Sequence, residues 1–146
     1  MKIAIGCDPN ASALKKELIP YIEKLGHSVD DLGSNDPIYA NTAINLAQRV
    51  AQGNYDRGIL ICGTGIGVCI AANKVKGAYA ALVNNVYQAQ RAELSNHANI
   101  ITLGAQVTGA ELAKVLVKEY LGCTFNPNSR SVPKIQRICD YEQEEK

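Results

Sequence analysis

The sequence lacks the features on which several broad classes of protein depend. Its 15 Lys+Arg nearly balance its 14 Asp+Glu, so the formal net charge is +1, whereas general nucleic-acid binders carry a basic excess or stripe. No stretch approaches the roughly 18 apolar residues of a membrane span. The opening residues MKIAIGCD do not have the layout of a signal peptide. We therefore expect a cytoplasmic protein that binds neither nucleic acid nor membrane.

Cysteine and histidine are few and unpatterned. The five cysteines and two histidines match no zinc-ligand spacing, so we expect no metal. An odd cysteine count without a secretory signal favours thiols in a reducing compartment over a disulfide framework. With 146 residues, the chain can bury a core without cross-links. We expect one domain over residues 1–146.

Short buried runs alternate with longer amphipathic stretches along the chain. This pattern predicts strands over residues 2–7, 27–32, 57–62, 78–83 and 99–103. It predicts helices over residues 12–25, 41–52, 65–74, 87–95, 108–121 and 131–145. No hairpin turn joins two strands, so the connections must cross over and the sheet must be parallel, with helices on both faces. The fold class is α/β, a three-layer sandwich with a five-stranded parallel sheet in the flavodoxin-like order 2-1-3-4-5.

For two of these helices, the sequence also predicts which residues make apolar contacts. In the helix over residues 41–52, we expect Ile44, Ala47 and Val50 to face the core. The polar tail helix offers Ile135 and Ile138 as apolar contacts, and a turn-rich stretch over residues 123–129 separates it from the core. We therefore expect the tail, from about residue 131, to pack on a neighbouring chain.

A glycine loop, residues 62–67, stands where such a fold binds its ligands. That place is beyond the carboxyl ends of the first and third strands, where the strand order reverses. The glycines let successive N–H groups point at a phosphate, a carboxylate or an oxyanion. The loop is no nucleotide-phosphate loop, since no Gly-Lys-Ser/Thr follows, and no dinucleotide fingerprint, since Val68 replaces the third glycine. A tight turn without any ligand explains the glycines equally well.

Cys62, the first residue of the glycine loop, favours a chemical role. It stands at a strand end just before a helix, where the helix dipole favours the thiolate. A thiolate there can be a nucleophile, or a base that removes a proton next to a carbonyl. We expect the other cysteines to be buried as small hydrophobic residues, although Cys7 could lie near Cys62. These other cysteines are Cys7, Cys69, Cys123 and Cys139.

The glycine loop, followed by Ala71-Ala72-Asn73-Lys74 and Gly77, resembles the signature of the type B ribose-5-phosphate isomerases. The subunits of galactose-6-phosphate isomerase are relatives of that family. The resemblance covers almost the whole chain. It implies a Rossmann-like sandwich, a homodimer or tetramer with shared active sites, and no metal or organic cofactor. It also implies aldose–ketose isomerisation of a sugar phosphate, of the ribose 5-phosphate to ribulose 5-phosphate type, through a cis-enediol.

The resemblance implies catalytic roles within the glycine loop. Cys62 matches the base that moves a proton between C1 and C2 of the sugar. Thr64 matches a hydroxyl linked with ring opening and with O1. The loop amides match an anion hole for the enediolate, and the glycines concerned are Gly63, Gly65 and Gly67.

The resemblance also implies contacts to the rest of the substrate. Asp8 and Tyr39 match positions that touch the sugar. Asn96 matches an amide donor that the neighbouring subunit contributes. Arg130 and Lys134 match a pair of phosphate-binding arginines, and a lysine keeps the charge but loses the bidentate fork.

The sequence departs from the family at positions concerned with ring opening and phosphate binding. Pro9 and Ser95 stand where the family has histidines, and the second of those helps to open the sugar ring. His97 could substitute, but a lone loop histidine is more often a solvated surface residue. Glu93 and Gln106 stand where the family has arginines, so two positive charges are missing.

Three hypotheses about function follow. The chain could be a working isomerase whose substrate needs no ring opening, such as a short sugar phosphate. It could be the cysteine-bearing subunit of a heteromeric galactose-6-phosphate isomerase, completed by a related chain that supplies the histidine. It could also be a non-catalytic sugar-phosphate binding protein, although such a protein needs no base at Cys62.

Overall fold

The computed structural model describes residues 1–33 and 35–144. Within them the chain forms five strands, six α-helices and one 3-10 helix. The strands are β1 (Lys2–Cys7), β2 (Ser28–Asp31), β3 (Arg57–Cys62), β4 (Ala80–Leu82) and β5 (Ile100–Gly104). The helices are η1 (Pro9–Ala11), α1 (Ser12–Lys24), α2 (Tyr39–Ala51), α3 (Ile66–Ala72), α4 (Val86–Leu94), α5 (Ala110–Gly122) and α6 (Val132–Gln143). All five predicted strands and all six predicted helices are present, with ends shifted by a few residues.

The strands form one parallel sheet in the order β2-β1-β3-β5-β4. The α/β class and the parallel sheet are therefore confirmed, but the expected order of the last two strands is wrong. All five residues of β5 are buried, whereas the three residues of β4 are only half-buried. The longer, more apolar strand takes the inner place beside β3. The strand order still reverses between β1 and β3.

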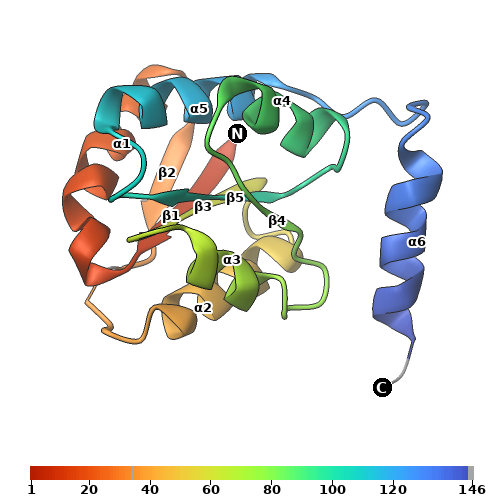
Figure 1. Cartoon of the computed structure of the whole chain (residues 1–146), viewed down its shortest axis with the longest axis horizontal. Helices are drawn as coiled ribbons and strands as arrows, with labels where there is room; N and C mark the ends of the chain where they lie inside the picture. The colour runs from red at the N-terminus through yellow and green to blue at the C-terminus, as the bar shows by residue number, and fades with distance from the viewer. Residues whose placement is uncertain (34, 145–146) are drawn as a thin grey trace.

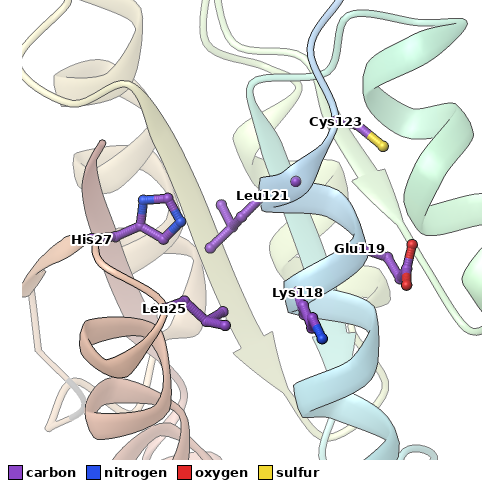
Figure 2. Close-up of a pocket in the computed structure, with 7 residues that line it drawn as sticks. Leu25, His27, Lys118, Glu119, Leu121 and Cys123 are labelled. Atoms are coloured by element: carbon purple, nitrogen blue, oxygen red, sulfur yellow. The ribbon is translucent and has the colours of Figure 1, made fainter.

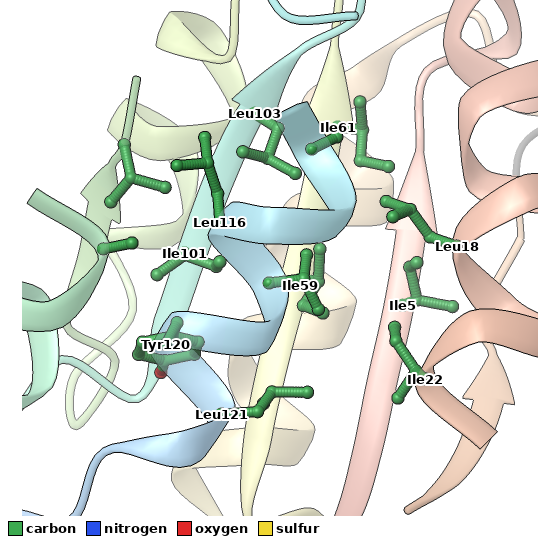
Figure 3. Close-up of a cluster of buried hydrophobic side chains, with 14 of the residues drawn as sticks. Ile5, Leu18, Ile22, Ile59, Ile61, Ile101, Leu103, Leu116, Tyr120 and Leu121 are labelled. Carbon is green, nitrogen blue, oxygen red and sulfur yellow. The ribbon is translucent and has the colours of Figure 1, made fainter. Parts of the chain in front are cut away.

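Helices cover both faces of the sheet (Figure 1). α1, α4 and α5 lie on one face, and α2 and α3 on the other. Every residue of β3 is buried, and its side chains alternate between the two layers. Ile59 and Ile61 point into the α1/α5 layer (Figure 3), whereas Leu60 and Cys62 point into the α2/α3 layer. Cys7 belongs to the α1/α5 layer, so the two thiols lie on opposite faces of the sheet.

Several expectations about burial are corrected. Ile44 is 37% exposed, because α2 turns Ala43 and Leu46 toward the sheet instead, whereas Ala47 and Val50 are buried as predicted. Of the four cysteines expected in the core, Cys7 is buried as predicted. The three others are only half-buried: Cys69 lies in the middle of α3, Cys123 just after α5, and Cys139 on the tail helix.

The tail helix α6 stands beside the rest of the molecule (Figure 1). None of its residues, 132–143, is buried. Ile138 is 53% exposed, so the expected apolar contact within the chain is weak at this position. Residue 145, the predicted end of the tail helix, lies outside the described residues. No helix within residues 1–33 and 35–144 is long and apolar enough to cross a membrane.

Two side-chain clusters fasten the tail to the amino ends of the strands. The first is the buried ion pair of Arg57 and Glu93, at 3.3 Å. In the connection after α5, Cys123 O accepts a hydrogen bond from Arg57, and the Phe125 N–H donates to Glu93. The second lies near the end of α6, where Glu142 accepts hydrogen bonds from the Gly77 N–H at 3.1 Å and the Tyr79 hydroxyl at 2.7 Å. Gly77 and Tyr79 immediately precede β4, so both clusters lie at the amino edge of the sheet.

Candidate functional site

The glycine loop leaves β3 at the carboxyl edge of the sheet, and β5 holds it in place. Three of its carbonyl oxygens accept hydrogen bonds from β5 or from residues just after it. The pairs are Cys62 O with Ala105 N at 2.8 Å, Gly63 O with Gln106 N at 3.0 Å, and Gly65 O with Thr102 Oγ1 at 2.8 Å. Because these carbonyls turn toward β5, the loop can present N–H groups on its other side.

Adjacent N–H groups on that side remain available to a ligand. Within the described part of the chain, the amides of Gly63 and Thr64 donate to no protein acceptor. Adjacent unpaired amides form a concave site that favours an oxygen carrying negative charge. The anion-binding interpretation of the loop therefore has a geometric basis in these two residues.

Gly65 has a conformation and a packing environment that exclude a side chain. Its φ is +78°, in the left-handed region. A Cβ atom at this position would stand 2.6 Å from Leu82 Cδ1 and 2.8 Å from the carbonyl carbon of Leu103. The turn that returns the chain toward α3 thus requires glycine here.

The Cys62 thiol and the Thr64 hydroxyl lie on the same turn. Cys62 is only 6% exposed, and its Sγ accepts a hydrogen bond from the Gly65 N–H at 3.1 Å. Thr64 is exposed, and its Oγ1 accepts from the Ile66 N–H at 3.2 Å. The hydroxyl proton of Thr64 is therefore free to point toward a ligand.

Tyr39 and Asp8 frame the loop from neighbouring elements. A Cβ on Gly67 would stand 2.4 Å from the Tyr39 hydroxyl oxygen, so the tyrosine ring lies directly over this glycine. The Asp8 N–H donates to Ile61 O at 2.9 Å, which places Asp8 beside the end of β3. The structure thus brings Asp8 and Tyr39 together with the loop that bears Cys62.

Gln106 also lies against the loop. Its side-chain amide atoms stand 3.6 to 3.8 Å from where a Cβ of Gly63 would lie. The residue that replaces a family arginine is therefore a neutral hydrogen-bonding group at the edge of the candidate anion site.

Three predicted site residues lie at the opposite edge of the sheet. Asn96 follows α4 and lines a cavity with Tyr79 and Ile138, near the start of β4. Arg130 and Lys134 lie on the connection to α6 and on its first turn; this segment is fastened at the amino edge at Phe125, before the helix, and at Glu142, near the end of the helix. Within one chain, the structure does not bring these residues to Cys62.

The chain's two histidines also lie away from the glycine loop. His27 precedes β2 at the amino edge, 3.0 Å from the N-terminal nitrogen, and burial with that nearby positive charge lowers its pKa. His97 stacks on Phe125 at 4.3 Å and approaches Glu93 at 3.7 Å. Ser95 accepts a hydrogen bond from Arg91 at 2.6 Å. None of these groups stands beside Cys62 of the same chain.

A pocket of about 350 Å³ at the amino edge is separate from this site (Figure 2). Leu25 and His27 line one side, and Leu121 and Cys123 at the end of α5 line the other. Burial raises the pKa of the Cys123 thiol, which disfavours its thiolate. Across residues 1–33 and 35–144, no group of three or more His, Cys, Asp or Glu side chains could hold a metal ion.

Sequence reasoning missed Thr102, which bonds the loop from β5. Its signal was visible as the one polar residue in the buried run Ile100–Gly104. A hydroxyl in an apolar strand needs a hydrogen-bond partner, and the partner could not be known without the pairing of β3 with β5.

Comparison with known proteins identifies this arrangement. Residues 3–138 match the model of the Ribose/Galactose Isomerase family. The chain is 45% identical to D-erythrulose-4-phosphate isomerase of Pectobacterium atrosepticum, covering all of this chain and 98% of that one. It is 47% identical to D-erythrulose-4-phosphate isomerase 2 of Mycolicibacterium smegmatis, covering 97% of each chain.

A solved structure agrees with the sequence comparison. Ribose-5-phosphate isomerase B of Mycoplasma genitalium, with bound ribulose-5-phosphate, superposes with a TM-score of 0.92 at 36% identity. The match covers 99% of this chain and 97% of that one. The chain thus belongs to the ribose/galactose isomerase family and is a sugar-phosphate isomerase.

Proposed function

We propose that the chain interconverts D-erythrulose 4-phosphate and the corresponding four-carbon aldose phosphate. One observation carries the proposal: the chain has Cys62 and the glycine loop, but Ser95, which accepts a hydrogen bond from Arg91, stands where the resemblance implies the ring-opening histidine. An enzyme built in this way suits a substrate that needs no ring opening. Two relatives with 45% and 47% identity bear the name of that activity.

Four-carbon sugar phosphates are acyclic for a simple chemical reason. A five-membered ring would need the C4 hydroxyl, which is esterified in a 4-phosphate. The C3 hydroxyl could close only a strained four-membered ring. Ribose 5-phosphate keeps its C4 hydroxyl and closes to a furanose, so an isomerase for it benefits from an acid or base that opens the ring.

The residues of the glycine loop supply each proton transfer. The Cys62 thiolate removes a proton from C1 of the ketose, and the developing charge on O2 is stabilised by the amides of Gly63 and Thr64. The Thr64 hydroxyl takes up the proton of O1 and delivers its own proton to O2, so the negative charge moves from O2 to O1. Cys62 then returns its proton to C2 of the cis-enediol, which gives the aldose and restores the thiolate.

We further propose that the enzyme is a cytoplasmic homodimer whose tail helix packs on the partner. Asn96, Arg130 and Lys134 lie at the opposite edge from Cys62 of their own chain, and a second copy would bring Asn96 to the sugar and the two cations to the phosphate. The unburied α6, with Ile138 exposed, supports a tail that gains contacts on assembly. The single domain over residues 1–146 then folds alone but shares its sites.

The first test compares substrates of different length and ring state. We expect kcat/KM for D-erythrulose 4-phosphate to exceed that for ribose 5-phosphate by about 100-fold or more. Ribulose 5-phosphate is also acyclic, since its C5 hydroxyl is esterified, and separates chain length from ring opening. If it is used as well as D-erythrulose 4-phosphate, chain length does not limit the enzyme. Efficient use of ribose 5-phosphate would refute the proposed substrate.

The second test addresses Cys62. We expect Cys62→Ala to lower kcat by at least about 1000-fold, because the base for both proton transfers is lost. Cys69→Ala is the matched control, since this half-buried cysteine lies seven residues further along on α3, and it should retain activity. A fully active Cys62→Ala enzyme would show that another group moves the proton.

The third test addresses shared sites. Cys62→Ala and the double variant Arg130→Ala/Lys134→Ala should each be nearly inactive alone. After mixed refolding, about one quarter of the wild-type activity should return, because half of the dimers then contain one intact site out of two. Mixing Cys62→Ala with Thr64→Ala is the control, since both changes damage the same loop and no intact site can form. Sites contained in one chain would give no recovery in either mixture.

A further inference from the structure

Thr102 is a polar residue at the centre of an apolar strand. It is fully buried, at 0% exposure, and its neighbours in β5 are Ile101 and Leu103. Valine has the same shape and would suit a buried parallel strand at least as well. The hydroxyl must therefore have a specific use, and its only contact of that kind in the described chain is the hydrogen bond to Gly65 O at 2.8 Å.

The peptide group between Gly65 and Ile66 transmits this contact to Thr64. Its carbonyl accepts from Thr102, and its N–H donates to Thr64 Oγ1 at 3.2 Å. A hydrogen bond at the carbonyl polarises the peptide and strengthens its N–H as a donor. The bond from Thr102 therefore helps to fix the direction in which Thr64 offers its proton.

The same contact bears on Cys62. Gly65 has no side chain, and its φ of +78° is not held by any preference of its own. The Gly65 carbonyl accepts a hydrogen bond from Thr102 on one side, and the Gly65 N–H donates to Cys62 Sγ on the other. Without the hydrogen bond from Thr102, the backbone of Gly65 could rotate, and the hydrogen bond from the Gly65 N–H to Cys62 Sγ would weaken.

We propose that Thr102 is a positioning residue for the isomerisation: its buried hydroxyl fixes Gly65 and thereby orients both Cys62 and Thr64. The proposal rests on the proposed function, since it assigns Thr102 to the same loop. It acts without touching the substrate, because Thr102 lies beneath the loop.

The first experiment compares Thr102→Val, which keeps the shape and loses the hydroxyl, with Thr102→Ser, which keeps the hydroxyl and loses a methyl group. We expect Thr102→Val to lower kcat about tenfold with KM changed by less than about twofold, as for an interaction that matters mainly in the transition state. Thr102→Ser should stay close to wild type. Should Thr102→Val not fold at the assay temperature, Thr102→Ala is compared with Thr102→Ser instead, since these two also differ in the hydroxyl.

The second experiment follows the pH profile of iodoacetamide alkylation at Cys62 by peptide mass spectrometry. It uses a Cys69→Ser background, because residues 62 and 69 share one tryptic peptide between Arg57 and Lys74. We expect the midpoint for Thr102→Val to move to higher pH, as weaker N–H donation to sulfur disfavours the thiolate. The Thr102→Ser midpoint should not move. Loss of packing alone would lower the unfolding temperature and leave this midpoint unchanged.

The two experiments separate the two proposals. Wild-type protein that isomerises no sugar phosphate would refute the proposed function, and the alkylation profiles would still test Thr102. An active wild type with Thr102→Val unchanged in kcat and in alkylation would overturn the role of Thr102 alone. Equal losses in Thr102→Ser and Thr102→Val would also overturn it, since the methyl group and not the hydroxyl would then be responsible.

Discussion

The glycine loop and the tail helix are fixed in the molecule by different means. The loop is held along its length by backbone hydrogen bonds to β5 and by contacts too close for any side chain. The tail is held at two points by charged and polar side chains, with no buried residue in α6. A single substitution that shifts the backbone of the loop should therefore disturb the whole loop. A single substitution at the tail should remove one contact and leave the other in place.

The largest effect is expected at the loop, from Gly65→Ala. The added methyl group would meet Leu82 and the backbone of β5 at 2.6 and 2.8 Å, in a left-handed conformation. We expect kcat to fall at least about 1000-fold, because a shift of the loop displaces the thiol and the anion site together. Steady-state kinetics on the four-carbon substrate checks this.

Gly53→Ala is the matched control for that change. Gly53 has a similar φ of +82°, but nothing lies within 4 Å of the added Cβ. It should lose only about 1–2 kcal/mol of stability, the cost of a left-handed non-glycine residue, and keep its kcat. Equal kinetic losses in both variants would mean that backbone strain, and not contact with β5, explains the effect of Gly65→Ala.

Most of the loop could be predicted from sequence, because local signals specify it. The buried run before Cys62 indicates the strand end, and the glycines indicate the turn. The network that uses Thr102 could not be predicted, since it depends on β5 and not β4 pairing with β3. The choice between those strands depends on the burial of whole strands and not on any local pattern.

The tail was predictable as a helix but not in its contacts. Its polar, amphipathic sequence indicates a helix near residues 131–145, and α6 spans Val132–Gln143. The pairing of Arg57 with Glu93 joins residues far apart in sequence, and no periodicity reports such a pair. Glu93 stands where the family has an arginine. In this chain it is buried at the amino edge and pairs with Arg57, so its negative charge does not lie beside the glycine loop of its own chain.

The next largest effect is expected at this anchor, from Arg57→Met. The change leaves the buried Glu93 carboxylate without its cation, and it removes the donors to Tyr120 O and Cys123 O. We expect a loss of about 3–5 kcal/mol in the free energy of unfolding, as for other broken buried pairs. Chemical denaturation monitored by circular dichroism measures it.

The double variant Arg57→Met/Glu93→Met sharpens the interpretation. It removes the unpaired charge together with its partner, so part of the lost stability should return. If the double variant is as unstable as the sum of the single ones, the two side chains do not act as a pair, and another contact fastens the connection after α5.

The smallest effect is expected at the far end of the tail, from Tyr79→Phe. The Tyr79 hydroxyl donates to Glu142 at 2.7 Å and lies 3.4 Å from Cys139 Sγ, and burial together with these contacts raises its pKa. Loss of this one bond should cost about 0.5–1.5 kcal/mol. Because Glu142 also accepts from the Gly77 N–H, the helix should remain attached but open more often.

Limited trypsin digestion detects that opening, since Lys134 and Arg137 lie in α6. Tyr79→Phe should be cut faster at these sites than wild type, while cleavage after Lys24, at the end of α1, stays unchanged. Tyr21→Phe is the control, a half-buried tyrosine on α1 far from the tail in sequence. If Tyr79→Phe speeds cleavage equally at every site, then the hydroxyl supports the whole fold, and the tail is not the independently loosened region that its two-point attachment predicts.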